Sequence, residues 1–381
     1  MGPLAGLRVV ELAGIGPVPF AAMLLADLGA DVVRVDRPSP FPVDPAAPRD
    51  PVLRGRRSVA VDLKAEAGRD VVLDLAGWAD VLLEGFRPGV MERLGLGPDA
   101  CHLRNPALVY GRMTGWGQDG PRASQAGHDI DYIALTGALH ATGRADEQPV
   151  PPLNLVGDLG GGALYLVVGA LAGVLHARTT GQGQVVDAAI VDGTVSLAHF
   201  IRGLQHLGMW GAPRGRNLLD TGAPFYEVYA CADGLPLAVG ALEPQFYDEL
   251  VRRSGIEVTP EVSPERRLDP RTWPEAKRQW AALFATRPRA EWLDLLDHTD
   301  ACVAPVLDWD ESLRDEHLAA RGTYVEHDGF LQASPAPRFD VTPAALDRPA
   351  PWPGQHTDEV LALLGRDAVA VSALRSAGAV A

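Results

Sequence analysis

The sequence predicts an α/β protein, with a large Rossmann-like domain on a parallel sheet and a smaller α+β domain. Over the first 190 residues, short runs rich in β-branched residues alternate with segments of helical period. This alternation is typical of βαβ units, whose parallel strands are covered by helices on both faces. The chain has 381 residues, enough for two domains, and its pattern changes after Asp192.

The first half contains five expected strands, and helical segments separate most of them. The strands are expected at 7–12, 31–35, 58–63, 80–84 and 108–113, and the helices at 20–28, 65–77 and around 90–105. Sheets of this kind bind ligands at the carboxyl ends of their strands. We therefore expect functional side chains in the loops that follow these strands.

The second half has a different order of elements. A helical pattern at 195–210 precedes a connector rich in Gly, Arg and Asn, and strand-like stretches at 225–229 and 235–240 come before helices near 244–254, 274–286 and 289–298. A proline-rich segment follows, and helical period returns at 358–364. We predict a large domain over 1–190 completed by 332–381, a linker over 191–225, a small α+β domain over 226–312 and a return linker over 313–331.

Composition excludes several classes of partner. The net charge of −15 argues against nucleic acid or an anionic membrane surface as the main ligand. Cys101, Cys231 and Cys302 are far apart and odd in number, as expected of a reduced cytoplasmic protein. We expect no signal peptide, and no membrane span, because the longest apolar run, 163–175, contains glycines and is too short.

Two segments suggest nucleotide-like ligands. Gly14-Ile15-Gly16 follows the first strand, but a third glycine is missing and two prolines, Pro17 and Pro19, remove amide donors that a pyrophosphate needs. NAD binding is therefore disfavoured. Between 34 and 57 lie six arginines and three aspartates, a local reversal of sign in an acidic chain. The arginines suit phosphate binding or structural ion pairs equally well.

Gly127-His128-Asp129 and Gly157-Asp158 provide an imidazole and a carboxylate, each beside glycine. Both groups are competent bases near neutral pH. On opposite faces of one carbon, they would invert a stereocentre next to a carbonyl. The structural alternatives are an ordinary loop histidine at a helix start and an aspartate N-cap.

The Asp158 segment and Glu243 have further possible roles. A helix beginning at Asp158 would direct free amides toward an enolate oxygen, and the glycines at 160–162 would let a ligand approach the backbone. Such stabilisation is needed because acid–base catalysis alone contributes only about 10²–10⁴-fold. Glu243 is either an exposed acid before a helix or the group that orients His128.

Six segments resemble the family III CoA-transferase superfamily and, within it, the α-methylacyl-CoA racemases. They are LAGLRVVEL at 4–12, ADLGADVV at 26–33, EGFRPGV at 84–90, TGWGQ at 114–118, GQGQVVD at 181–187 and HTDEVL at 356–361. The resemblance implies an interlocked homodimer in which two long linkers join the domains and the active site lies between subunits. It also implies that His128 and Asp158 are the catalytic bases and that Glu243 is the partner of His128. The CoA-contacting residues would be Arg37, Val61, Leu63, Gly85, Arg87, Arg93 and Tyr132.

The expected reaction is therefore interconversion of (2R)- and (2S)-2-methylacyl-CoA thioesters by 1,1-proton transfer. CoA would enter as part of the substrate, with no metal or other cofactor. The apolar residues Phe200, Ile201, Leu204, Leu207 and Trp210 are expected to hold the acyl tail. The alternatives are a CoA transferase with Asp158 as acyl-carrying nucleophile, an acyl-CoA-binding protein without turnover, and an NAD-dependent oxidoreductase.

Overall fold

A computed structural model describes residues 2–38 and 47–381. The chain divides into two compact units. One comprises the residues up to Thr136, Leu153–Leu197 and Gly322–Ala381, and the other comprises Gly137–Pro152 and Ala198–Arg321.

The units differ from the predicted domains at residues 137–152 and at both predicted linkers, which divide between the units after residues 197 and 321. Residues 137–152 group with the second unit, where Arg144 forms an ion pair with Glu227 at 2.9 Å. Residues 322–331 group with the first unit, to which they are connected by the ion pair between Arg49 and Asp328. Ion pairs between residues this far apart in the chain leave no signal in local periodicity.

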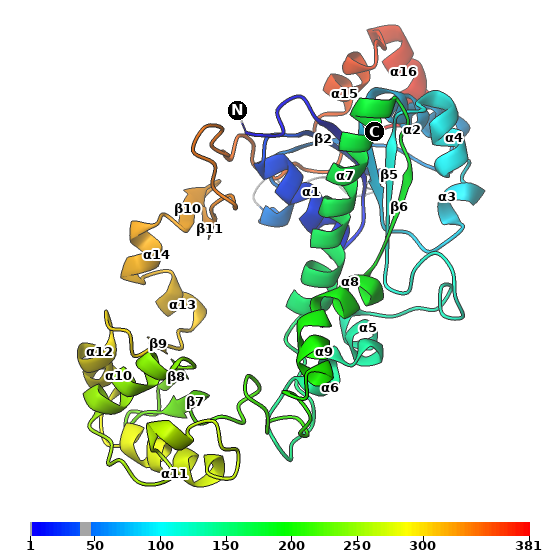
Figure 1. Cartoon of the computed structure of the whole chain (residues 1–381). Helices are drawn as coiled ribbons and strands as arrows, with labels where there is room; N and C mark the ends of the chain where they lie inside the picture. Colours follow the sequence, from blue (N-terminus) through cyan, green and yellow to red (C-terminus); the bar gives the residue numbers. More distant parts are fainter. Residues whose placement is uncertain (1, 39–46) are drawn as a thin grey trace. The chain divides into compact units, whose positions relative to one another are not determined.

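The first unit is built on a six-stranded sheet in which every pair of neighbours is parallel (Figure 1). The strand order is β3-β2-β1-β4-β5-β6, the doubly wound order, so the direction of winding reverses between β1 and β4. The strands are β1 (Arg8–Leu12), β2 (Asp31–Asp36), β3 (Arg56–Ala60), β4 (Val81–Glu84), β5 (Val109–Thr114) and β6 (Val185–Ala189). The predicted α/β class is confirmed. β6 was not predicted, because most of its side chains are not buried and its apolar signal is therefore weak.

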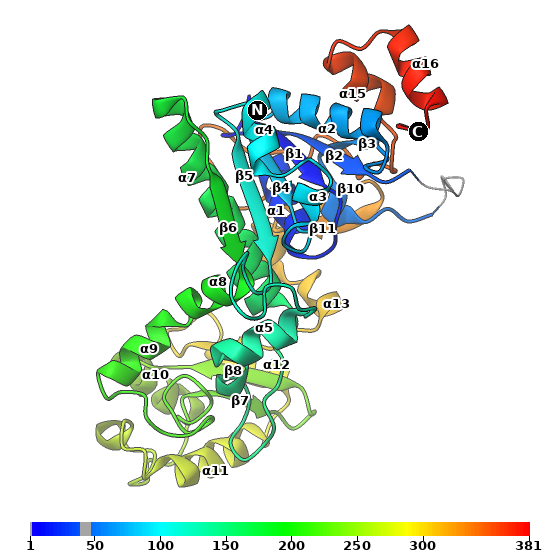
Figure 2. The same cartoon turned by 90° about the vertical axis from the view of Figure 1, so that its right-hand side faces the viewer.

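Helices cover both faces of this sheet (Figure 2), which is why its strands are rich in Val and Leu. One core contains α1 (Pro17–Asp27), α5 (Asp129–Thr136), α7 (Leu164–Thr180) and α8 (Ile190–Leu197). The other contains α2 (Glu66–Trp78), α3 (Val90–Arg93), α4 (Pro98–Arg104), α15 (Thr357–Leu363) and α16 (Ala368–Ser376). Outside these cores are the short helix η1 (Pro51–Leu53) and a hairpin of β10 (Tyr324–His327) and β11 (Phe330–Ala333).

A π-helix, η2 (Leu155–Ala163), continues directly into α7. Together they form one helical stretch, Leu155–Thr180, that is long and apolar enough to cross a membrane. This stretch is longer than the sequence suggested. However, α7 runs along β5 and β6 with Leu166, Ala170 and Val174 in the core (Figure 1). Packing on the sheet therefore explains the apolar residues on one side of α7, whereas Leu164, Val168 and Leu175 are exposed.

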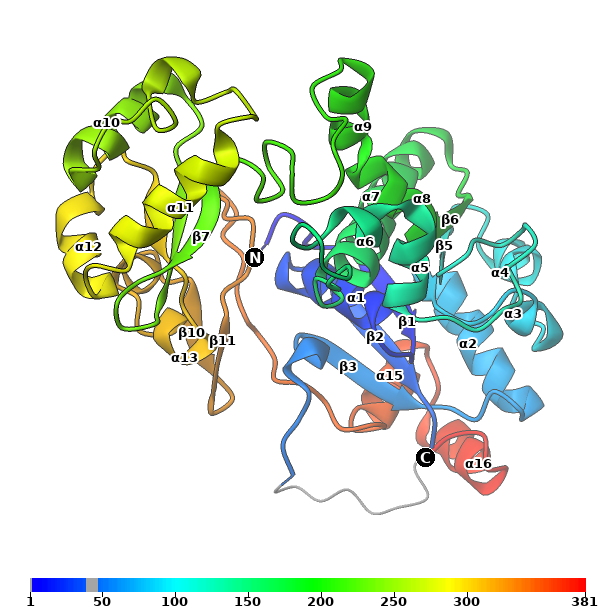
Figure 3. The same ribbon diagram turned by 90° about the horizontal axis from the view of Figure 1, so that it is seen from below.

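The second unit contains an antiparallel sheet of β7 (Tyr226–Ala230), β8 (Pro236–Gly240) and β9 (Val303–Pro305), which are labelled in Figure 1; Figure 3 shows β7 from below. An aromatic-rich core packs α10 (Pro244–Ser254), α11 (Trp273–Phe284) and α12 (Arg289–Leu296) against it. The remaining helices are α6 (Ala138–Ala141), α9 (His199–His206), η3 (Pro264–Arg266), α13 (Trp309–Ser312) and α14 (Glu316–Ala320). These elements agree with the predicted small α+β domain.

The single helix predicted at 195–210 is wrong. The structure has two helices, α8 and α9, with a break at Ala198, and the helix ends before Leu207. Trp210 is buried, whereas Phe200 and Leu207 are exposed. The residues expected to hold the acyl tail therefore do not form one continuous helix face.

Candidate active site

A cavity of about 380 Å³ lies in the first unit, at the carboxyl ends of β1, β4 and β5. It is lined by the loop after β1 (Ile15, Gly16), the start of α1 (Pro17, Val18), the loop after β4 (Gly85, Phe86, Arg87, Pro88) and the end of β5 with its loop (Met113, Thr114, Gly115, Trp116). Residues 123 and 125–128 with Tyr132, Asp158 and Ile190 complete the wall. The direction of winding reverses between β1 and β4, and the loops after both strands line this cavity. Doubly wound sheets bind their ligands at this kind of position.

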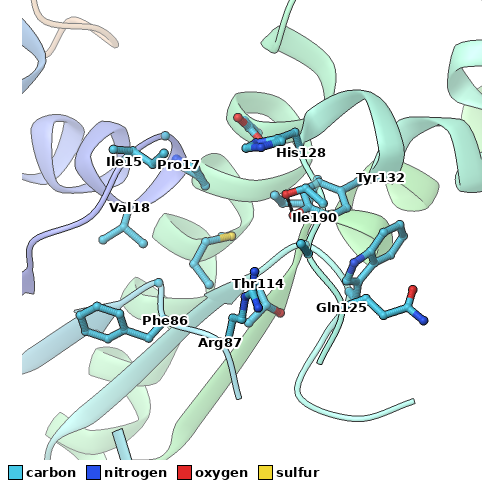
Figure 4. Close-up of a pocket in the computed structure, with 18 of the residues that line it drawn as sticks. Ile15, Pro17, Val18, Phe86, Arg87, Thr114, Gln125, His128, Tyr132 and Ile190 are labelled. Atoms are coloured by element: carbon cyan, nitrogen blue, oxygen red, sulfur yellow. Dashed lines mark hydrogen bonds between the residues drawn. The ribbon is translucent and has the colours of Figure 1, made fainter. Parts of the chain in front are cut away.

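His128 lies immediately before α5 and lines this cavity. Its backbone N–H donates to Asp131 Oδ2 at 2.9 Å, and its carbonyl accepts from the Asp131 amide, also at 2.9 Å. These reciprocal bonds hold the helix start in place. Figure 4 shows His128 across the cavity from Phe86 and Arg87. The predicted loop-to-helix position of His128 is confirmed.

Asp158 lines the same cavity but does not begin a helix. It lies inside η2, whose N-cap is Asn154, and the amide of Leu159 donates to the Asn154 carbonyl at 3.1 Å. The Asp158 amide donates to Asp129 Oδ1 at 2.7 Å. The predicted N-cap is therefore wrong, and the Asp158 amide is not free for an enolate oxygen.

The glycines at 160–162 allow close packing between helices. A Cβ on Gly161 would lie 2.5 Å from Thr194 Oγ1 and 2.7 Å from the Thr194 amide nitrogen. A Cβ on Gly162 would lie 3.0 Å from the Ile190 side chain. Both neighbours belong to α8, so protein atoms already fill the space beside Gly161 and Gly162. The predicted approach of a ligand to this backbone is wrong at Gly161 and Gly162.

The environment of Asp158 favours its neutral form. Burial raises the pKa of the half-buried Asp158 carboxyl, and the negative charge of Asp129 raises this pKa further. A hydrogen bond from Asn154 and the His128 imidazole act in the opposite direction. A carboxyl with a raised pKa in a cavity is a candidate general base and acid.

Three of the expected CoA-contacting residues, Gly85, Arg87 and Tyr132, line the same cavity as the two bases. Gly85 follows β4, and a Cβ there would lie 3.0 Å from Val18 Cγ2. The Tyr132 hydroxyl donates to the Gly127 carbonyl, and its ring meets Trp116 edge to face at 4.8 Å. Tyr132 therefore also supports the backbone next to His128.

Comparison with known proteins identifies the family. The model of CoA-transferase family III matches residues 4–357. The chain belongs to CoA-transferase family III. It is 45% identical to human alpha-methylacyl-CoA racemase over 95% of this chain and 93% of that protein. It is 31% identical to succinyl-CoA–D-citramalate CoA-transferase of Chloroflexus aurantiacus, over 95% and 94% of the two chains. A CaiB/BaiF family protein from Brucella suis has a similar structure, with a TM-score of 0.80, 26% identity and coverage of 95% and 99%.

The other four expected CoA contacts of this CoA-transferase family III chain lie outside the cavity. Arg37 follows β2 and Arg93 ends α3, and both are exposed. Val61 is fully buried in a core cluster, and the half-buried Leu63 packs against the same cluster. The Val61 amide donates to the Asp36 carbonyl at 2.8 Å. The Val61 side chain is therefore a core residue, and the contact of Val61 with CoA stays a prediction.

The arginine-rich segment of this family member consists mostly of structural ion pairs. Five of its arginines pair with acids: Arg34 with Glu11 and Asp36, Arg49 with Asp328, Arg54 with Asp27, Arg56 with Glu11, and Arg57 with Asp31 and Glu359. The interpretation of this cluster as a phosphate site is wrong for these five. The sixth, Arg37, is exposed and forms no ion pair within the part of the chain that the structure describes.

Glu243 belongs to the second unit. It is exposed and occupies the N-cap position of α10, as the structural interpretation predicted. Its pairing with His128 stays a prediction.

Sequence reasoning missed part of the cavity and one charged neighbour. Ile15, Met113 and Ile190 provide apolar lining, and Asp129 accepts the Asp158 amide. The position of Ile15 after the first strand was a usable signal, since the loops after the strands were expected to line the site. The contact between Asp129 and Asp158 could not be seen in the sequence, because it joins residues that are 29 positions apart.

Proposed function

We propose that this family III CoA-transferase chain is a 2-methylacyl-CoA racemase that works by 1,1-proton transfer. The observation that carries the proposal is that one cavity contains both the His128 imidazole and the Asp158 carboxyl. The 45% identity to a protein named alpha-methylacyl-CoA racemase supports this function over CoA transfer. The active form would interconvert the (2R) and (2S) epimers of a 2-methylacyl-CoA.

In this mechanism one base removes the α-proton and the electron pair of the broken C–H bond delocalises onto the thioester oxygen. The other base then donates a proton to the opposite face of the enolate. His128 takes the proton of one epimer and Asp158 that of the other. The enzyme ends with its single proton on the other base, so the next turnover in the same direction requires a proton exchange.

The developing enolate needs a donor other than the Asp158 amide, which is already bound to Asp129. The first amides of a helix have no acceptor within that helix. In α5 these are the amides of Asp129 and Ile130, directly after His128. We propose that this helix start, with its positive dipole end, stabilises the enolate oxygen.

The remaining features of the proposal concern CoA and assembly. Arg37, Arg87 and Arg93 are exposed cations after β2, after β4 and in α3, and they suit the phosphates of CoA. No metal or redox cofactor is required. The chain would act in the cytoplasm as an interlocked homodimer whose active sites lie between subunits, with Glu243 orienting His128. The three free cysteines suit a reducing compartment.

The test is NMR of one pure 2-methylacyl-CoA epimer incubated with the protein in D₂O. We expect loss of the α-proton signal together with appearance of the other epimer. Asp158→Asn and His128→Ala should each lower racemisation by at least about 10²-fold, the usual contribution of one acid–base group. Near wild-type turnover by both variants would disprove the two-base mechanism.

The same sample distinguishes the alternatives. CoA transfer to an added free acid without α-proton exchange, together with hydroxylamine trapping at Asp158, would identify a transferase. CoA-thioester binding with neither exchange nor transfer would identify a binding protein.

A further inference from the structure

We propose that Asp129 is the positioning residue for Asp158: its carboxylate holds the Asp158 backbone and faces the Asp158 carboxyl with a second negative charge. This inference rests on the proposed two-base reaction. The Asp129 carboxylate does not line the cavity and would act through Asp158, whereas the contact proposed above for the enolate uses only the Asp129 backbone amide.

The contact is short and specific. Asp129 Oδ1 accepts the Asp158 amide at 2.7 Å and so replaces the acceptor that a regular helix would provide. The turn of η2 is widened here, since the amide of Leu159 bonds five residues back, to Asn154. A carboxylate acceptor gives a stronger hydrogen bond than a neutral group. Asp129 therefore fixes where the Asp158 side chain leaves the backbone.

Gly157 leaves room for this carboxylate. A Cβ at position 157 would lie 2.2 Å from Asp129 Oδ1 and 2.8 Å from Ile133 Cγ2. Gly157 is buried, and any larger residue there would displace the Asp129 side chain. Gly157 and Asp129 are therefore packed directly against each other.

Few other charges act on Asp158. The His128 imidazole precedes α5, and Tyr132 of α5 has a pKa that is raised by burial and by the Asp158 charge. The first turn of α1 contains no charged residue, and a Cβ built on its N-cap, Gly16, would lie 3.5 Å from Asp158 Oδ2. In the adjacent elements, Arg112 of β5 and Asp192 of α8 act on Asp187 of β6.

A negative neighbour is useful to a two-base racemase. The two bases share one proton, and each epimer needs a different tautomer of the pair. Between a free aspartate and a free histidine in water, the tautomer with a protonated carboxyl would be about 400-fold rarer than the imidazolium tautomer. Each unit by which the carboxyl pKa rises makes that tautomer about tenfold more common. The charge of Asp129 would thus increase the population of the tautomer in which Asp158 is protonated and the neutral His128 imidazole can remove a proton.

The principal variant is Asp129→Asn, which retains an oxygen acceptor for the Asp158 amide but removes the charge. We expect the acid limb of the kcat/KM profile to move to lower pH, because the Asp158 pKa falls. At neutral pH the rate should fall about tenfold for each unit of that shift, equally in both directions of the reaction. KM should change little, since the substitution keeps the Asp129 backbone amide and the Asp129 side chain does not line the cavity.

A second variant disturbs the contact between Asp129 and the Asp158 amide without replacing a titratable residue. Gly157→Ala should push the Asp129 carboxylate away and shift the acid limb in the same direction. Asp129→Ala, which removes the acceptor as well, should lower kcat by about 10²-fold. Asp70→Asn, an exposed position on α2, changes net charge equally and should leave the profile unchanged. Thermal unfolding and CoA affinity identify any variant that fails to fold.

The outcomes separate this inference from the proposed function. If the wild-type protein does not exchange the α-proton, the racemase function fails. ¹³C NMR titration of the Asp158 carboxyl in the wild-type protein and in Asp129→Asn still measures the predicted fall in pKa without any turnover. If the wild-type protein racemises while folded Asp129→Asn and Gly157→Ala keep the wild-type acid limb and carboxyl titration, the role of Asp129 is disproved.

Discussion

At the scale of single residues, the same residue type has different roles within one short segment. Arg56 is fully buried and its guanidinium lies 3.2 Å from Glu11, whereas Arg37 is exposed. Arg54 is buried and pairs with Asp27 at 2.6 Å. Removing one partner of a buried ion pair destabilises the folded protein, because the other charge stays buried without a counter-charge. An exposed arginine at a strand end is instead available to a phosphate.

This difference gives a residue-scale prediction. Arg37→Ala should raise KM for an acyl-CoA about tenfold, corresponding to about 1.4 kcal/mol, with kcat nearly unchanged. Arg54→Ala should lower the free energy of unfolding by about 3–5 kcal/mol, because Asp27 remains buried and unpaired. Steady-state kinetics at two salt concentrations and urea denaturation measure the two effects. A raised KM in folded Arg54→Ala, without one in Arg37→Ala, would contradict the assignment.

At the scale of elements, glycines determine how η2 packs on α8. Asp158 is placed in the cavity by a widened helical turn that lies against the backbone of α8, and Gly161 is buried in that contact. A side chain at position 161 would meet the backbone, which cannot rotate away as a side chain can. The position of a candidate catalytic residue therefore depends on a residue that has no chemical function.

Gly161→Ala should destabilise the protein by about 1–3 kcal/mol and lower racemisation, because overpacking shifts η2. The matched variant is Gly77→Ala in α2, where a Cβ would meet nothing within 4 Å. That change should stabilise the protein by about 0.5–1 kcal/mol, since alanine favours a helix. Urea denaturation compares the two, and equal free energies of unfolding for both variants would contradict this account of the η2–α8 contact.

At the scale of the whole molecule, the proposed groups of the reaction are divided between the two units. His128 and Asp158 belong to the first unit, and Glu243 to the second. If the active site lies between subunits, as we propose, each site takes Glu243 from the partner. The arrangement can be tested by mixing inactive subunits.

Refolding an equal mixture of Asp158→Asn and Glu243→Gln subunits should restore about a quarter of wild-type activity. Half of the dimers would then be mixed, and each mixed dimer would contain one intact site. Light scattering of the same sample gives the oligomeric state. No recovery in a dimer that contains both subunits would show that Glu243 acts within its own chain.

Local sequence patterns predicted the α/β class, five of the six parallel strands and the two candidate bases, His128 and Asp158, that line one cavity. These features follow from local periodicity and from short motifs. Only the folded chain shows which arginines pair with acids, that Asp158 lies inside a π-helix, and that the Asp158 amide is bound to Asp129. It also showed that Val61 is a core residue. These facts depend on contacts between residues that are distant in the chain, and such contacts exist only once the sheet and its helices have packed.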